Sequence, residues 1–138
     1  MKKSNSETIL VVDDDPAILL LVKAILEGRG YRVLLAENGD SAIHLLELHQ
    51  LRIDLVLTDV VMPNLSGAEL AKCLVAMRPG LRVLFMSAFQ DSDAVRVQIV
   101  EKGSGFVAKP FKTEGLVSAV ERALEQSAPE QPKFFSMP

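Results

Sequence analysis

The sequence has no tryptophan, a single cysteine, no excess of basic residues and no long apolar run. One cysteine, Cys73, excludes a disulfide framework and a zinc site built on cysteines. Fifteen basic residues against 18 acidic ones give a net charge of −3, which argues against sequence-independent nucleic-acid binding because that needs a basic face. The longest apolar stretch, Ala17 to Val22, is too short to cross a bilayer. The start of the chain also lacks the apolar run that a signal peptide would need. We therefore expect a soluble, cytoplasmic protein with no direct nucleic-acid or membrane partner.

The length of 138 residues suits one domain with a single core, and 49% of the residues are hydrophobic. We expect a flexible N-terminus over residues 1–6 and a folded domain over 7–126. Residues 127–138 contain three prolines and the pair Phe134 and Phe135, a composition that favours a tail or the start of a linker over core.

Five short β-rich runs alternate with five helical patterns along the chain. We expect strands over 8–12, 32–36, 54–58, 82–86 and 105–108, and helices over 16–27, 39–49, 66–77, 92–102 and 113–126. The runs 9–12 and 55–57 are continuously apolar, which is typical of strands covered on both faces in a parallel sheet. The alternation predicts an α/β fold with right-handed crossovers and a doubly wound, five-stranded parallel sheet.

Polar residues follow four of the five predicted strands. Three aspartates, residues 13–15, come after the first strand; Asp59, Ser87 and Lys109 come after the third, fourth and fifth. Ligands of open α/β sheets bind beyond the carboxyl ends of the strands. If the 32–36 strand is an edge, giving the order 2-1-3-4-5, these groups meet in one shallow site.

The predicted acidic cluster favours a divalent cation over a bound phosphate. Asp15 is explained as the N-cap of the 16–27 helix, but neighbouring carboxylates repel one another unless a cation lies among them. Oxygen ligands of this type suit Mg²⁺. A carboxylate such as Asp59 beside the metal is a competent nucleophile for phosphorus. Asp14, Ser87 and Lys109 could then supply the metal ligand, hydroxyl and cation that the transferring oxygens need.

These residues carry a resemblance to the receiver domains of two-component response regulators. The matching segments are 9–15 (ILVVDDD), 54–63 (DLVLTDVVMP), 86–88 (MSA) and 105–111 (GFVAKPF), and the resemblance covers roughly residues 7 to 126. It implies a flavodoxin-like (βα)5 fold. It also implies a phosphoacceptor that takes a phosphoryl group from a sensor histidine kinase or a histidine phosphotransfer protein, without turnover of a separate substrate.

The resemblance also implies a role for each matching residue. Asp59 corresponds to the phosphoacceptor, and Mg²⁺ is implied as the cofactor. Asp14 is implied as a direct metal ligand, Asp13 as its acidic partner through water, and the backbone carbonyl of Val61 as the third protein ligand. Ser87 is implied as the switch hydroxyl, Lys109 as the lysine that pairs with the phosphoryl group, and Phe106 as the aromatic switch. The bond between Lys109 and Pro110 is expected to be cis.

Phosphorylation is expected to switch the surface formed by the predicted 92–102 helix, the 105–108 strand and the 113–126 helix, which could also form a homodimer. Two other classes remain as alternatives. An aspartyl-phosphate phosphohydrolase usually carries a second aspartate two residues after the nucleophile, where this chain has Val61. A flavodoxin-type nucleotide-binding module would need a glycine-rich or hydroxyl-rich first loop, where this chain has aspartates.

Two further expectations concern side-chain exposure. Along the 16–27 helix, helical spacing favours Ile18, Leu21, Val22 and Ile25 as the face on the sheet. Leu19 and Leu20 would then be partly exposed beside the site and could contact the phosphohistidine donor. We also expect Cys73 to pack as a small hydrophobic residue. His44 and His49 are assigned neither phosphotransfer nor metal binding.

Overall fold

The computed structural model describes residues 7–49, 52–63, 65–88 and 105–125. These form one parallel sheet with the strand order β2-β1-β3-β4-β5, as the sequence predicted. The strands are β1 (Thr8–Val12), β2 (Arg32–Ala36), β3 (Leu55–Asp59), β4 (Arg82–Ala88) and β5 (Gly105–Lys109). The helices are α1 (Pro16–Glu27), α2 (Gly39–His49), α3 (Gly67–Met77) and α5 (Thr113–Glu125). The predicted 92–102 helix and the 127–138 tail lie outside the described residues.

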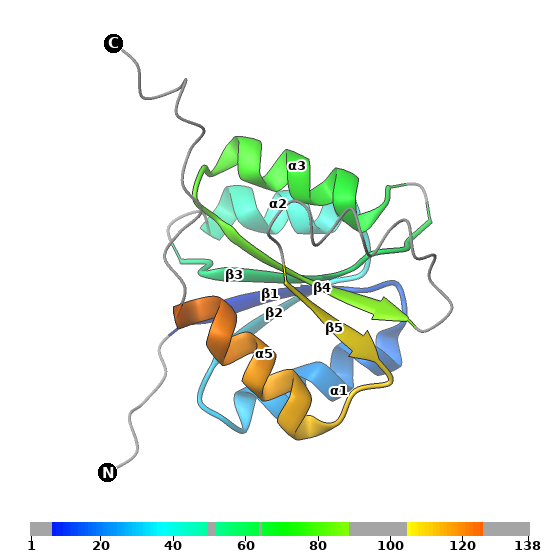
Figure 1. Ribbon diagram of the computed structural model, residues 1–138. Helices are drawn as coiled ribbons and strands as arrows, with labels where there is room; N and C mark the ends of the chain where they lie inside the picture. Colours follow the sequence, from blue (N-terminus) through cyan, green and yellow to red (C-terminus); the bar gives the residue numbers. More distant parts are fainter. Residues whose placement is uncertain (1–6, 50–51, 64, 89–104, 126–138) are drawn as a thin grey trace.

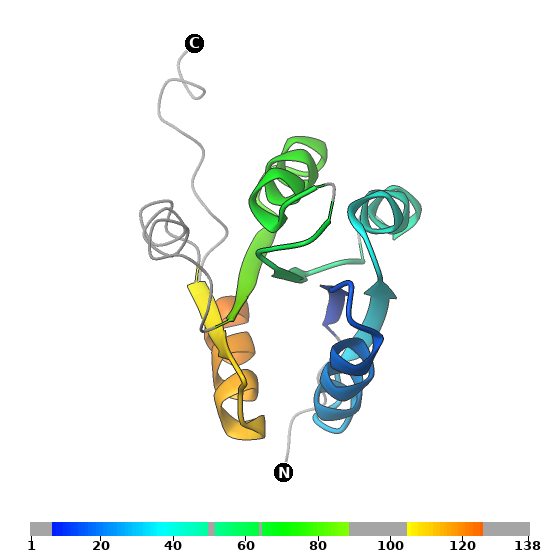
Figure 2. The same cartoon turned by 90° about the vertical axis from the view of Figure 1, so that its right-hand side faces the viewer.

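Helices cover both faces of the sheet (Figures 1 and 2). Helices α2 and α3 lie on one face, and α1 and α5 lie on the other. The core is accordingly divided into two layers. Leu10, Val56 and Leu74 belong to the layer under α2 and α3, whereas Ile9 and Leu57 belong to the layer under α1 and α5. Alternate residues of β1 and β3 therefore enter opposite layers, and both strands are fully buried.

The helix ends near the carboxyl edge of the sheet are fixed by local polar contacts. Asp15 is the N-cap of α1, and its Oδ1 accepts a hydrogen bond from the Ala17 N–H at 2.9 Å. Ser66 and Glu69 form a capping box at the start of α3, in which each side chain accepts from the other residue's backbone N–H at 3.1 Å. These caps begin the helices that follow β1 and β3, the strands that lead into the predicted acidic residues.

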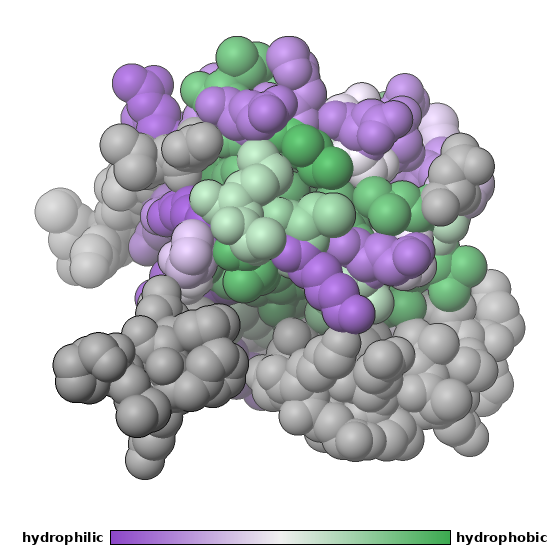
Figure 3. Space-filling view, turned by 90° about the horizontal axis from the view of Figure 1, so that it is seen from above, coloured by the Kyte–Doolittle hydropathy of each residue, from purple (hydrophilic) through white to green (hydrophobic). Residues whose placement is uncertain are grey.

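The outer faces of α2 and α3 mix hydrophilic and hydrophobic residues, as the view from above shows (Figure 3). Leu48 and Val75 are large apolar residues that remain exposed there. Cys73 is also exposed, so the prediction that it packs as a small hydrophobic residue was wrong. Within the described ranges, no helix is long and apolar enough to cross a membrane.

The predicted face of α1 was wrong in part. Leu19 is buried, together with Val22 and Leu26. Leu21, which was expected to cover the sheet, is instead 48% exposed, and Leu20 is 64% exposed as predicted. Because residues 17–22 are all apolar, more than one helical stripe fits the sequence, and packing on the sheet selects the one that includes Leu19.

Candidate functional site

The carboxyl ends of β1, β3 and β5 bring one basic and three acidic side chains together. Oxygen atoms of Asp13, Asp14 and Asp59 all lie within 4.8 Å of one another. Nζ of Lys109 is 2.8 Å from Oδ2 of Asp13 and 3.4 Å from Oδ2 of Asp59. The structure thus confirms that these residues converge, although they are far apart in the sequence.

The predicted bounds of β1 and β2 are confirmed, but the predicted carboxyl ends of β3, β4 and β5 were short by one or two residues, which changes the position of the site residues. Asp59 and Lys109 are the last residues of β3 and β5, and Ser87 lies inside β4. Their backbones are therefore held in the sheet. In the register, Asp59 pairs with Met86, and Ser87 pairs with Ala108, so Ser87 is one residue beyond the neighbour of Asp59.

The three aspartates differ sharply in their exposure. Asp13 is only 1% exposed and Asp59 is also buried, whereas Asp14 is exposed. Both oxygens of Asp13 are engaged, because Oδ1 accepts from the Asp15 N–H at 2.9 Å and Oδ2 accepts from Lys109. Asp14 therefore stands at the open side of the cluster, where an ion from solvent can reach it.

Burial and charge together perturb the pKa values of Asp59 and Lys109. Burial is the largest effect on Asp59 and raises the pKa of its carboxyl group. The Lys109 ammonium lowers this pKa and the Asp13 carboxylate raises it, so the pKa of Asp59 lies above its usual value. Burial by itself lowers the pKa of Lys109, but its hydrogen bond with Asp13 and the charge of Asp59 outweigh burial and raise it. Lys109 is thus held as a cation between two carboxylates.

The loop after β3 is fastened to the strand end by backbone contacts. The backbone of Val61 forms a hydrogen bond with the Asp59 carboxylate, and the Gly67 N–H donates to the Val60 carbonyl at 2.7 Å. A Cβ atom on Gly67 would overlap the backbone oxygen of Asp59. The closeness of Gly67 to Asp59 was not predicted; the only signal was its place beside Ser66 at the start of α3.

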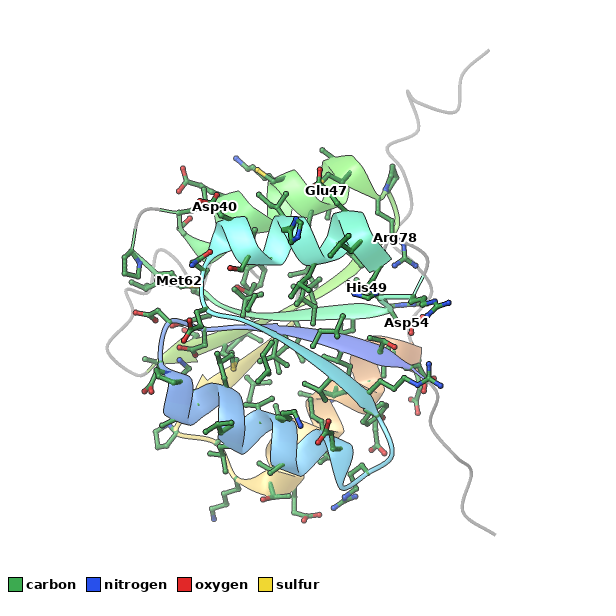
Figure 4. All side chains as sticks on the ribbon, turned by 180° about the vertical axis from the view of Figure 1, so that it is seen from behind. Asp40, Glu47, His49, Asp54, Met62 and Arg78 are labelled. Atoms are coloured by element: carbon green, nitrogen blue, oxygen red, sulfur yellow. The ribbon has the colours of Figure 1, made fainter. Side chains whose placement is uncertain are left out.

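Residues at the rim of the site complete the predicted set. Val61, two residues after Asp59, is 57% exposed, and Phe106, near the start of β5, is 39% exposed. The Lys109–Pro110 bond is cis, as expected. Met62 lies at the site end of the sheet, and His49, Asp54 and Arg78 lie at the opposite end (Figure 4). His49 is therefore remote from the acidic cluster.

The donor set fits a hard divalent cation. Three carboxylates at this spacing offer only oxygen ligands, and one of them faces solvent. Mg²⁺ prefers such oxygens and keeps several of its waters. The ammonium of Lys109 occupies one side of the cluster, which leaves the Asp14 side for the ion.

Comparison with known proteins agrees with this geometry. The family model of the response regulator receiver domain matches residues 9–121. The chain is 32% identical to the sensor kinase CckA of Brucella abortus over 89% of this chain and 13% of that protein. It is 30% identical to the DNA-binding response regulator MtrA of Mycolicibacterium smegmatis, over 95% of this chain and 56% of that protein. It thus spans only part of the length of either relative.

A solved structure shows the same fold. The response regulator receiver domain protein of Clostridium thermocellum superposes with a TM-score of 0.80 at 27% identity, over 95% of this chain and 99% of that one. The matches support the receiver interpretation over the two alternatives, a phosphohydrolase and a nucleotide-binding module.

Proposed function

The chain belongs to the response regulator receiver domain family and is a phosphoacceptor module of two-component signalling, and from that premise we propose that Asp59 is the residue that accepts the phosphoryl group. The observation that carries the proposal is the convergence of Asp13, Asp14 and Asp59 around the Lys109 ammonium. We further propose that the domain occupies residues 7–126 and works in the cytoplasm.

Asp59 would act as the nucleophile. One carboxylate oxygen would form a bond to phosphorus while the bond from phosphorus to the donor imidazole nitrogen breaks, and the imidazole leaves with its electron pair. The hydrogen bond from the Val61 backbone orients the carboxylate. Because Asp59 closes a strand of the sheet, its backbone is fixed before the donor arrives, which lowers the entropic part of the barrier.

Asp13, Asp14 and Asp59, with the Val61 carbonyl, would hold Mg²⁺. When bound, the ion supplies positive charge that stabilises the transferring phosphoryl oxygens. Lys109 supplies a second positive charge 3.4 Å from Asp59, and the buried Ser87 is proposed to donate a hydrogen bond to the phosphoryl group. The domain would modify itself in this way, without turnover of a separate substrate.

We propose that the donor is the phosphohistidine of a sensor kinase or a phosphotransfer protein. The relatives include a sensor kinase and a DNA-binding response regulator, so the same module occurs beside different partners. The output surface would include Phe106, whose exposed ring is proposed to turn inward as Ser87 moves. Homodimerisation through this surface stays a prediction.

Labelling with acetyl phosphate tests the site directly. With Mg²⁺, intact mass should show the addition of one phosphoryl group; Asp59→Asn should abolish it, and EDTA should suppress it. Asp14→Asn should raise the Mg²⁺ concentration needed for labelling, because it removes a ligand at the open side. Asp15→Asn is the matched control, since asparagine also caps helices well, and it should label normally. Undiminished labelling of Asp59→Asn would refute the assignment.

A further inference from the structure

Thr58 is a polar residue that follows three apolar ones in β3 and directly precedes Asp59. It is fully buried, and its neighbours in the register are Val12 on β1 and Phe85 on β4. A valine has nearly the same shape and would fill this position without burying a hydroxyl, which costs free energy unless the hydroxyl is hydrogen-bonded. Packing therefore gives no reason for the hydroxyl at this position.

The hydroxyl of Thr58 is bonded to the backbone of the proposed phosphoacceptor. Its Oγ1 donates a hydrogen bond to the backbone carbonyl of Asp59, with 3.0 Å between the two oxygen atoms. This carbonyl belongs to the peptide group that joins Asp59 to Val60, whose N–H donates to the Met86 carbonyl on β4 at 3.1 Å. Because a peptide group is planar, contacts at its C=O and at its N–H together fix the orientation of the whole group.

The start of α3 contacts the same stretch of backbone. The Gly67 backbone packs so closely against the Asp59 carbonyl that a Cβ atom on Gly67 would overlap the carbonyl oxygen. The Gly67 N–H also donates to the Val60 carbonyl at 2.7 Å. Thr58 therefore adds a side-chain contact to a peptide group that backbone atoms of β4 and α3 also contact.

Val61, the residue that follows Val60, has two tasks at the site. Its backbone forms a hydrogen bond with the Asp59 carboxylate, and its carbonyl is proposed above as a ligand of Mg²⁺. Only the two backbone dihedral angles of Val60 separate Val61 from the Asp59–Val60 peptide group. A change in the orientation of that group is therefore transmitted to both functional groups of Val61.

We propose that Thr58 is a positioning residue of this site. Its hydroxyl holds the Asp59–Val60 peptide group in the orientation that directs Val61 toward the Asp59 carboxylate and the cation. The inference rests on the proposed function of Asp59 and deepens it. Thr58 would act through the backbone, without contact to the phosphoryl group or the ion, so removal of its hydroxyl should weaken Mg²⁺ binding in a domain that remains folded.

Three replacements separate the hydroxyl from the packing of the side chain. Thr58→Val keeps the branched shape and removes the hydroxyl, whereas Thr58→Ser keeps the hydroxyl and removes the methyl group. Thr58→Ala removes both. Thr8→Val is the matched control, because Thr8 is also a buried threonine and stands at the amino end of β1, opposite the edge that carries the site.

The first measurement uses metal-free protein and needs no phosphorylation. ¹⁵N NMR records the amide proton shift of Val61, which reports the hydrogen bond to the Asp59 carboxylate. This signal should move upfield in Thr58→Val and stay near its parental position in Thr58→Ser and Thr8→Val. Titration with Mg²⁺ then gives a dissociation constant that should rise about 5-fold in Thr58→Val, the factor typical of one hydrogen bond. It should stay near the parental value in the other two variants.

Urea unfolding verifies that each variant is folded under the conditions of the titration. If Thr58→Val does not fold, Thr58→Ala and Thr58→Ser make the same comparison, because they differ only in the hydroxyl. The expected order of Mg²⁺ affinity is then Thr58→Ser above Thr58→Ala.

Two results would overturn the proposal. One is a parental Val61 signal or a parental Mg²⁺ dissociation constant in Thr58→Val. The other is an equal weakening of Mg²⁺ binding in Thr58→Ser and in the variant that lacks the hydroxyl, which would mean that packing alone matters. The proposed function of Asp59 would fail on a different result, undiminished labelling of Asp59→Asn by acetyl phosphate, and that result leaves the Val61 measurement unaffected.

Discussion

Replacing Gly67 by alanine should disturb the strand end that carries Asp59. The added Cβ would overlap the Asp59 backbone oxygen and would lie 2.9 Å from Cα of Val60. These neighbours are backbone atoms, so no flexible side chain can move aside. The positive-φ glycines in the described part of the chain are Gly30 and Gly80, so Gly67 is not required for its dihedral angles and the cost is purely steric.

The size of the effect follows from three contributions. Forcing a methyl group into a packed position costs about 1–3 kcal/mol, and stretching the 2.7 Å bond from Gly67 to the Val60 carbonyl costs about 1 kcal/mol more. The helix propensity of alanine returns at most about 1 kcal/mol. The free energy of unfolding should therefore fall by about 2 kcal/mol, equivalent to a Tm about 8 °C lower for a domain of this size.

Urea and thermal unfolding measure the loss, with Gly115→Ala as the opposite case. Its Cβ meets open space in α5, so that variant should be as stable as the parent or slightly more stable. Labelling of folded Gly67→Ala by acetyl phosphate should slow by up to about 100-fold, since a shift of about 1 Å in a reacting group can cost that much. Parental stability together with a parental labelling rate in Gly67→Ala would refute the steric argument.

Three other substitutions test separate parts of the structure. Lys109→Met should lower the free energy of unfolding by about 2–3 kcal/mol in EDTA, because it leaves the buried Asp13 carboxylate without its cation; an unchanged urea midpoint would contradict this. Val61→Asn should shorten the lifetime of the phosphorylated form, because an amide at this exposed position can orient a water molecule. The decay is measured after donor removal at fixed Mg²⁺, and equal or slower decay would refute this prediction. Leu20→Glu should slow transfer from a phosphohistidine protein and leave acetyl phosphate labelling intact. Leu19→Glu should instead unfold the domain, because Leu19 is buried. Equal loss of both reactions in Leu20→Glu would indicate misfolding.

Sequence pattern was sufficient to predict the fold and the members of the acidic cluster. Continuously apolar strands alternating with amphipathic helices leave few alternatives to a doubly wound parallel sheet. In such a sheet all carboxyl ends share one edge, so residues at or just beyond the ends of β1, β3 and β5 must meet. That is why Asp13, Asp59 and Lys109 could be placed together despite their separation in the chain.

The packing of individual side chains was decided only by the tertiary structure. Six consecutive apolar residues start α1, so periodicity did not distinguish Leu19 from Leu21; the rotation of the helix on the sheet did. Three aspartates follow β1 in the sequence, and only the folded structure shows that Asp13 is buried against Lys109 while Asp14 remains in solvent. The contact of Gly67 with Asp59 had no sequence signal of its own. Hydrophobic periodicity acts locally along each element, whereas burial, ion pairing and close backbone contact depend on neighbours from distant segments, which exist only once the layers have packed.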